Sequence, residues 1–167
     1  MRHIRIDDEV EIDRPPPDVF AFLADQEHRP AWSRGLHRVR RTSDHTYRMA
    51  GTAIGRRGEA TYEVTGQEPD RSFSGRLSWP RLSCDEAYNL HDEEGRTWLR
   101  VKVTARPDRR LSLLAPVLGF LLRRHVRHDL RRLRATLEGP TRKDAEEPEA
   151  EPRPAESPPE DEPVTPV

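Results

Sequence analysis

The feature that most constrains the fold is a series of segments in which apolar and polar side chains alternate. In segment 57–65, for example, Ala60, Tyr62 and Val64 share one side, and glutamate and threonine residues occupy the other. A period of two residues places successive side chains on opposite faces of a β-strand. Strands of this kind are expected at 4–12, 36–41, 46–54, 57–65, 71–79, 82–90 and 97–105. The pattern predicts an antiparallel meander of about seven strands with one apolar face.

The last regular segment has a helical period instead. It begins near Ala115 or Pro116 and ends before Gly139, and one narrow stripe holds its apolar residues, Leu122, Val126, Leu130, Leu133 and Leu137. Two shorter helices are expected after the first strand, one following Pro15 and one over 26–33. Only the C-terminal helix is long enough to cover the sheet, so the fold class is expected to be α+β with this helix against the apolar face.

The C-terminal residues have a different composition. Residues 139–167 contain eight prolines, nine acidic residues and three basic ones, which gives a net charge of −6. A segment with so few apolar side chains cannot offset the loss of chain entropy on folding. We expect a folded domain at 1–138 and a disordered, Pro/Glu-rich acidic tail at 139–167.

The single cysteine, Cys84, excludes an intrachain disulfide and any metal site built on several cysteines. The N-terminus lacks the apolar stretch of a signal peptide, and the apolar run 111–122 is too short to span a bilayer. These features predict a cytoplasmic protein. No nucleotide-binding, hydrolase or metalloprotease motif is present, so no cofactor or metal is expected.

Several phrases of the sequence resemble a known family. The opening VEIDRPPPDVFAFLADQEHRPAWSRG, the segments YEVTGQEPDRSFSGR and GRTWLRVKVTARP, and the closing LLRRHVRHDLRRLRATLE are similar to the SRPBCC superfamily, in particular its polyketide cyclase/dehydrase-like branch. The resemblance covers about residues 4–138. It implies a helix-grip (START-like) fold, in which a curved antiparallel sheet is wrapped around the C-terminal helix with an apolar cavity between them.

Glu86 is the polar residue hardest to explain by packing alone. Its alternation with Cys84 and Tyr88 places it on the inward face, where an unpaired carboxylate is costly. Either a cavity uses it as a polar anchor, or a bulge turns it to solvent. The residues expected to bind a ligand are Trp32, Tyr62, Trp79, Cys84, Glu86, Tyr88, Leu118, Leu122 and Val126.

Other motifs have simpler interpretations. The glycine-rich segment 51–58 precedes a strand rather than a helix, so turn glycines are favoured over a phosphate site. His125, His128 and Asp129 lie off the apolar stripe and are expected to be solvated, as are the arginines of 123–134, without nucleic acid as a partner. Those arginines are also candidates for contact with the acidic tail. For 111–122 ordinary burial is favoured, with a cavity entrance or transient contact with a membrane surface or a protein as the alternatives.

Three functions follow from these observations. The favoured one is binding or transport of an apolar small molecule such as a polyketide, lipid or quinone. The second is a polyketide cyclase or dehydratase that uses Glu86 with Tyr62 or Tyr88 as acid and base. The third is a protein-interaction module that uses 111–122 and the tail.

Overall fold

The computed structural model describes residues 3–53 and 55–139. Apart from Gly139, the predicted acidic tail lies outside the described residues. The elements in chain order are β1 (Ile4–Ile12), α1 (Pro16–Ala24), the short 3-10 helix η1 (Gln26–His28), α2 (Arg29–Trp32), β2 (Leu36–Arg41), β3 (Thr46–Ala53), β4 (Arg56–Glu68), β5 (Ser72–Trp79), β6 (Leu82–Glu93), β7 (Arg96–Pro107), η2 (Leu111–Leu114) and α3 (Ala115–Glu138).

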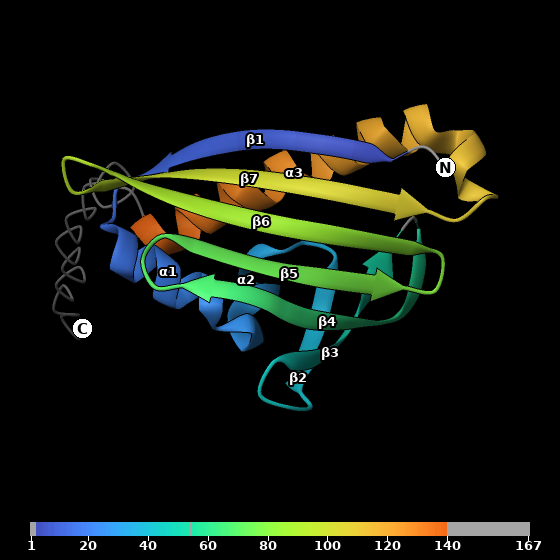
Figure 1. The fold of residues 1–167 in the computed structure, drawn as a ribbon, viewed down its shortest axis with the longest axis horizontal. Coiled ribbons are helices and arrows are strands. Elements are labelled where there is room, and N and C mark those ends of the chain that lie inside the picture. Colours follow the sequence, from blue (N-terminus) through green and yellow to red (C-terminus); the bar gives the residue numbers. More distant parts are fainter. Residues whose placement is uncertain (1–2, 54, 140–167) are drawn as a thin grey trace, which may run out of the picture.

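The seven strands form one antiparallel sheet in the order β1-β7-β6-β5-β4-β3-β2. Strands β2 to β7 pair with one another in chain order. β1 pairs with β7 at the other edge of the sheet, with Ile6 opposite Val103. The sheet curves around α3, which lies behind it, while α1 and α2 cover one end (Figure 1). The predicted helix-grip fold is confirmed.

The alternation in the sequence gives the inner face of the sheet. Every second residue of β6, from Leu82 to Leu90, is buried, and the register between β5 and β6 is unbroken. Glu86 therefore points inward, and no bulge turns it to solvent. β3 ends at Ala53, and the expected last residue of this strand, Ile54, is outside the described residues.

Two glycines make room for close contacts inside the sheet. A Cβ atom at Gly75 would lie 2.1 Å from the hydroxyl oxygen of Tyr62, so the tyrosine ring occupies the space that a side chain would need. A Cβ atom at Gly51 would lie 2.3 Å from the carbonyl oxygen of Gly35. The absence of a side chain at Gly51 therefore lets β3 pack closely against the backbone just before β2, which is a structural role for this glycine.

Polar contacts tie α3 to the N-terminal segment. Arg127 donates to Asp8 on the inward side of β1 at 2.8 Å, and Arg14 donates to the carbonyl oxygen of Leu137 at 3.0 Å. Arg132 donates to the carbonyl oxygen of Ala31 in α2 at 2.9 Å. All three contacts lie in the second half of α3 and hold that half against β1, the segment after it and α2.

The segment 111–122 departs from the favoured prediction of ordinary burial. Only Ala115 and Leu118 of α3's first turns are buried, whereas Leu113 is 85% exposed and Phe120 is 68% exposed. The physical reason is that one helix face meets the sheet, so the opposite apolar face has no partner among the described residues. None of the helices in 3–53 and 55–139 has both the length and the apolar character needed to cross a bilayer.

Candidate functional site

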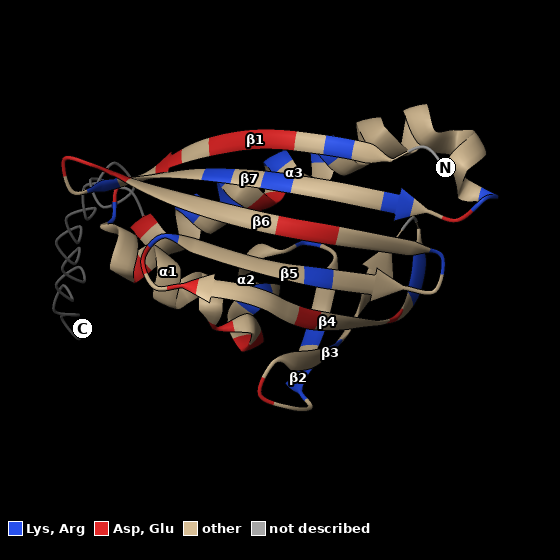
Figure 2. Ribbon diagram, in the orientation of Figure 1, with Lys and Arg blue, Asp and Glu red and all other residues tan. Residues whose placement is uncertain are grey.

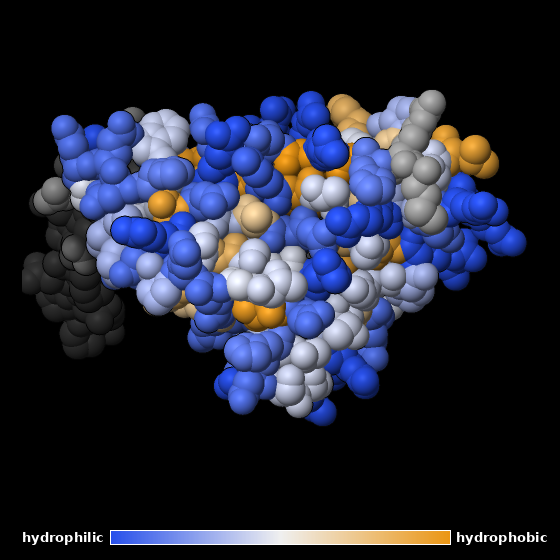
Figure 3. All heavy atoms as spheres, viewed as in Figure 1, coloured by the Kyte–Doolittle hydropathy of each residue, from blue (hydrophilic) through white to orange (hydrophobic). Residues whose placement is uncertain are grey.

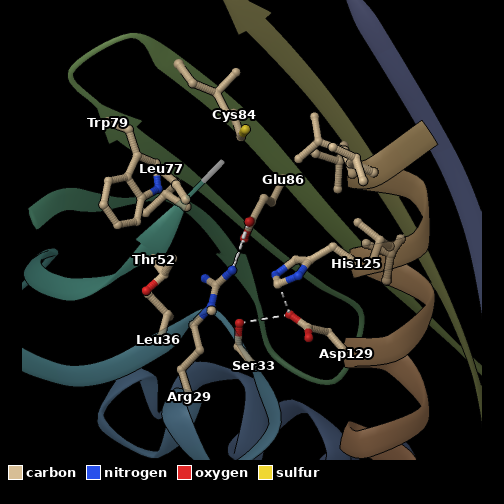
Figure 4. A pocket seen from close by; sticks show the side chains of 18 of the residues that line it. Arg29, Ser33, Leu36, Thr52, Leu77, Trp79, Cys84, Glu86, His125 and Asp129 are labelled. Atoms are coloured by element: carbon tan, nitrogen blue, oxygen red, sulfur yellow. Dashed lines mark hydrogen bonds and ion pairs between the residues drawn. The ribbon is translucent and has the colours of Figure 1, made fainter. Parts of the chain in front are cut away.

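A cavity of about 380 Å³ lies between the inner face of the sheet and α3. Aliphatic and aromatic side chains make up most of its wall, among them Leu77, Trp79, Val103, Leu122 and Val126. Polar side chains converge on it from α2, β6 and α3 (Figure 4). An apolar wall with a few converging polar groups is typical of sites for small organic molecules.

Eight of the nine residues predicted to bind a ligand line this cavity, namely Trp32, Trp79, Cys84, Glu86, Tyr88, Leu118, Leu122 and Val126. The exception is Tyr62, which is fully buried and does not reach the cavity wall. The structure thus brings together residues from α2, β5, β6 and α3. Their role in ligand binding stays a prediction.

The polar centre of the wall is an ion pair between Arg29 and Glu86. The guanidinium donates from one terminal nitrogen to both carboxylate oxygens, at 2.8 and 2.6 Å. Tyr88 donates its hydroxyl to the same carboxylate at 3.2 Å. Arg29 is 5% exposed and Glu86 is 9% exposed, so both charges are withdrawn from solvent. In this geometry, the attraction and hydrogen bonds between the two charges offset the desolvation cost that an unpaired buried Glu86 would carry.

Aromatic rings hold the guanidinium in place. Its central carbon lies 4.7 Å from the centre of the Tyr62 ring and 5.3 Å from that of Trp32. Gln26 accepts a hydrogen bond from Arg29 and donates to the carbonyl oxygen of Leu23. Arg29 therefore covers Tyr62, and this is why the tyrosine does not reach the cavity.

Burial changes the protonation behaviour of the groups around the ion pair. Burial opposes the charge of Arg29, but Glu86 together with Tyr88 and Tyr62 outweighs burial and holds the Arg29 pKa above its usual value. Burial and the same carboxylate raise the pKa of Tyr62 and that of Tyr88. They also raise the pKa of the Cys84 thiol to about 12. The tyrosines and the thiol are consequently neutral near neutral pH, so Cys84 is a poor nucleophile.

A second polar cluster lies where α3 meets α2. Asp129 accepts hydrogen bonds from the Ser33 hydroxyl at 2.8 Å and from the Arg34 amide at 3.1 Å. Nε2 of His125 lies 3.3 Å from the same carboxylate, and the imidazole is on the cavity wall (Figure 4). The expectation that His125 and Asp129 are solvated is wrong for Asp129, which is 8% exposed. His125 keeps 43% of its side chain exposed, and His128 is half-buried.

Sequence reasoning missed Arg29 as a functional residue. Gln26, Arg29 and Trp32 recur every third residue in a predicted helix, which places them on one side of it. A carboxylate predicted to face inward also requires a cation. Taken together, these two signals indicate the pair. Asp129 gave a weaker signal, because its partner Ser33 lies 96 residues away.

No group of three or more His, Cys, Asp and Glu side chains that could hold a metal occurs within 3–53 and 55–139. The polar groups on the cavity wall include the hydrogen-bonded cluster of Arg29, Glu86 and Tyr88 and the imidazole of His125.

Comparison with solved structures gives the same architecture. The Zhui aromatase/cyclase from Streptomyces sp. R1128 superposes with a TM-score of 0.71 at 14% identity, covering 82% of this chain and 94% of that one. A START superfamily protein from Mycobacterium smegmatis gives 0.64 at 16% identity, covering 83% and 96%. The protein DR_A0006 from Deinococcus radiodurans gives 0.61 at 21% identity, covering 80% and 96%. At these identities the likeness shows the fold alone.

None of the curated proteins compared with the chain matches its sequence. The family described as "Polyketide cyclase / dehydrase and lipid transport" matches residues 3–138, which is the whole of the predicted domain apart from its first two residues. The chain is therefore a member of this family, in the START-like SRPBCC superfamily.

Proposed function

We propose that the protein binds an apolar small molecule in the cavity between the sheet and α3, as a carrier rather than as an enzyme. The observation that carries the proposal is the cavity itself, whose volume of about 380 Å³ is in the range that holds compact organic ligands. Its family includes proteins of lipid transport and polyketide chemistry, which both handle apolar molecules.

The ligand is expected to have one polar end. The aliphatic wall favours a hydrocarbon or ring system by the hydrophobic effect. Glu86 and Tyr88 lie on the wall, and a ligand hydroxyl can donate to the carboxylate beside Arg29. A polyketide, a quinone or a single-chain lipid meets this description, and a fully polar metabolite does not. A cytoplasmic location, as the sequence predicts, is part of the proposal.

Native mass spectrometry before and after organic extraction tests this function directly. A reproducible apolar adduct that extraction removes, and that rebinds to the extracted protein, is the expected result. The Trp79 indole on the cavity wall gives a second readout, because ligand entry changes its fluorescence. Absence of any adduct, together with no thermal shift from lipids, quinones and aromatic polyketides, would overturn the proposal.

A pair of matched variants separates cavity binding from surface adhesion. Val126 is half-buried and lines the cavity, so Val126→Phe fills space that the ligand needs. Val39 in β2 is also half-buried but does not line the cavity. We expect V126F to weaken binding at least about tenfold, since a steric clash replaces favourable contact, while V39F leaves it unchanged. Equal effects of the two substitutions would contradict cavity binding.

A second candidate function is proton abstraction beside a carbonyl, as in a cyclase or dehydratase. The sequence suggested Glu86 with Tyr62 or Tyr88, but Arg29 occupies both oxygens of Glu86, and the pKa of each tyrosine is raised. His125 is better placed as the base. Nε2 of His125 lies 3.3 Å from the Asp129 carboxylate, which leaves Nδ1 as the nitrogen that can accept a proton, so Asp129 acts as the residue that orients the imidazole.

Deuterium exchange at the carbon beside the carbonyl of a bicyclic ketone such as tetralone tests this second function. If the protein is an enzyme, it accelerates the exchange, and His125→Gln removes the acceleration but retains ligand binding. If the protein is a carrier, exchange proceeds at the rate without protein for wild type and H125Q alike.

A further inference from the structure

The start of α3 presents a second apolar face that nothing in the described residues covers. Leu113 is 85%, Phe120 is 68% and Val117 is 59% exposed, and Leu114 and Leu121 are exposed beside them. The buried residues Ala115 and Leu118 lie on the opposite side of the same turns. Figure 3 shows hydrophobic side chains at this end of the molecule. We define Leu113, Leu114, Val117, Phe120 and Leu121 as the apolar tip. Contiguous apolar surface of this kind marks an interaction site.

Basic residues flank the apolar tip on both sides. Arg109 and Arg110 precede it, and Arg123 and Arg124 follow it. All four are exposed, and none forms an ion pair with another residue of 3–53 or 55–139. The chain has no Asp or Glu between Arg109 and His128. The first turns of α3 consequently show no acidic segment (Figure 2).

A shallow basic groove continues from the tip along the outer side of α3. Phe120 and Leu121 form part of its wall, and the rest consists of two histidines and five arginines, namely His125, His128, Arg34, Arg123, Arg124, Arg127 and Arg131. The surface thus combines exposed apolar side chains with an adjacent groove lined by basic side chains. Lipid bilayers with anionic headgroups have the complementary arrangement, with hydrocarbon below a layer of phosphate.

We propose that the apolar tip and its flanking arginines dock the protein on an anionic lipid bilayer. The tip inserts at the level of the headgroups, and Arg109, Arg110, Arg123 and Arg124 contact lipid phosphates around it. Exposed apolar side chains between two pairs of cations match an anionic bilayer, in which lipid phosphates lie directly above hydrocarbon. In Figure 1 the beginning of α3 projects at one end of the molecule, where it can meet a flat surface.

Docking at this position would place the cavity next to the bilayer. Leu121 is 48% exposed and at the same time lines the cavity, together with Leu118 and Leu122 one turn apart. An apolar molecule could then pass from lipid to cavity along leucine side chains without crossing water. This transfer rests on the proposed function, whereas the docking itself does not depend on the cavity.

Sedimentation with vesicles tests the docking. We expect the full chain to bind vesicles of phosphatidylcholine and phosphatidylglycerol, to bind pure phosphatidylcholine much more weakly, and to lose binding as salt is raised. Leu113→Ser with Phe120→Ser should reduce the partition coefficient at least about tenfold, because two exposed apolar side chains no longer insert. Both residues are exposed, so the fold should tolerate the change.

Charge reversal supplies the matched control. Arg123→Glu with Arg124→Glu should reduce binding to anionic vesicles at least about tenfold. Arg38→Glu with Arg40→Glu changes the net charge equally on exposed positions of β2, away from the tip, and should leave binding near the wild-type value. Equal loss in both pairs would show that only net charge matters and would overturn a defined docking surface.

Two further outcomes distinguish this inference from its alternatives. Failure of the wild type to bind anionic vesicles, with self-association that L113S/F120S abolishes, would make the tip a protein interface and overturn the proposal. Vesicle binding without any apolar ligand in native mass spectrometry would support docking and sink the proposed carrier function.

Discussion

At the scale of single residues, the pair of Arg29 and Glu86 sets the chemistry of the interior. A buried ion pair contributes little more to stability than apolar residues of similar volume would. Its place on the cavity wall, with Tyr88 donating to the same carboxylate, therefore supports a role in orienting a ligand. Each charge is nevertheless tolerated in the interior only because the other is present, since removal of one partner leaves the other as an unpaired buried charge.

The first prediction concerns this dependence. Glu86→Leu and Arg29→Met, made singly, should each lower the free energy of unfolding by about 3–5 kcal/mol, because each leaves one uncompensated charge. The double variant should recover most of that loss, since both charges are gone. Urea unfolding of the four proteins measures the coupling. Additive losses in the double variant would show that the two charges do not compensate each other.

The second prediction concerns the space beneath Arg29. In Gly75→Ala the new methyl carbon would lie only 2.1 Å from the Tyr62 hydroxyl oxygen. The fully buried tyrosine ring must therefore move. We expect a loss of about 1–3 kcal/mol in the free energy of unfolding, as for overpacked cores. Gly95→Ala is not a suitable control because φ is positive there. Gly58→Ala is suitable, since its Cβ would lie at an ordinary 3.4 Å from Trp79. Similar losses for G75A and G58A would contradict the argument.

At the scale of elements, Asp129 joins α3 to the segment after α2. Its carboxylate accepts from the Ser33 hydroxyl and the Arg34 amide, and this contact closes one side of the cavity beside His125. The short helix α2 has only four residues, so it depends on such contacts for its position. Arg29 is the first residue of α2, and the position of the ion pair depends on the same contact.

The third prediction follows from this contact. Asp129→Ala leaves the Ser33 hydroxyl and the Arg34 amide without their acceptor and should lower the free energy of unfolding by about 1–3 kcal/mol. Hydrogen exchange of the Arg34 amide should become faster in the same variant. The exposed Asp44, which pairs with Arg41 at the surface, serves as control, and Asp44→Ala should change little. Unchanged protection of the Arg34 amide in D129A would show that α2 is held by other contacts.

At the scale of the whole molecule, the protonation of the interior links stability to pH. The raised pKa values of Cys84, Tyr62 and Tyr88 mean that the folded state keeps their protons more tightly than the unfolded chain does. The stabilising contribution is complete below the unfolded pKa values of 9.0 for the thiol and 10.0 for the tyrosines. It is lost as pH rises from there towards the folded values.

The fourth prediction is a fall in stability that begins near pH 9, where the unfolded thiol starts to lose its proton. The midpoint of urea unfolding, measured over an alkaline series, should decrease from that pH onward. Cys84→Ala removes the earliest part of the fall and should leave the part above pH 10, which comes from the tyrosines. A midpoint that stays constant well above pH 10 would contradict the raised pKa values.

The sequence by itself determined the elements and the family. Alternation of apolar side chains and the helical stripe are local properties, so they predict the seven strands and α3. The sequence left open whether Glu86 points inward, and the unbroken register of β6 with its neighbours decided it. The phrases that resemble the SRPBCC superfamily gave the arrangement of the sheet around the helix, and the match over 3–138 agrees.

Only the tertiary structure decided the partners. Glu86 of β6 meets Arg29 of α2 across 57 residues of chain, and Asp129 of α3 meets Ser33 across 96, because elements far apart in sequence lie side by side in the fold. The same packing covers Tyr62 with a guanidinium and leaves Phe120 exposed. Periodicity indicates which side of an element is apolar, but whether another element covers that side depends on the position of each element in the fold.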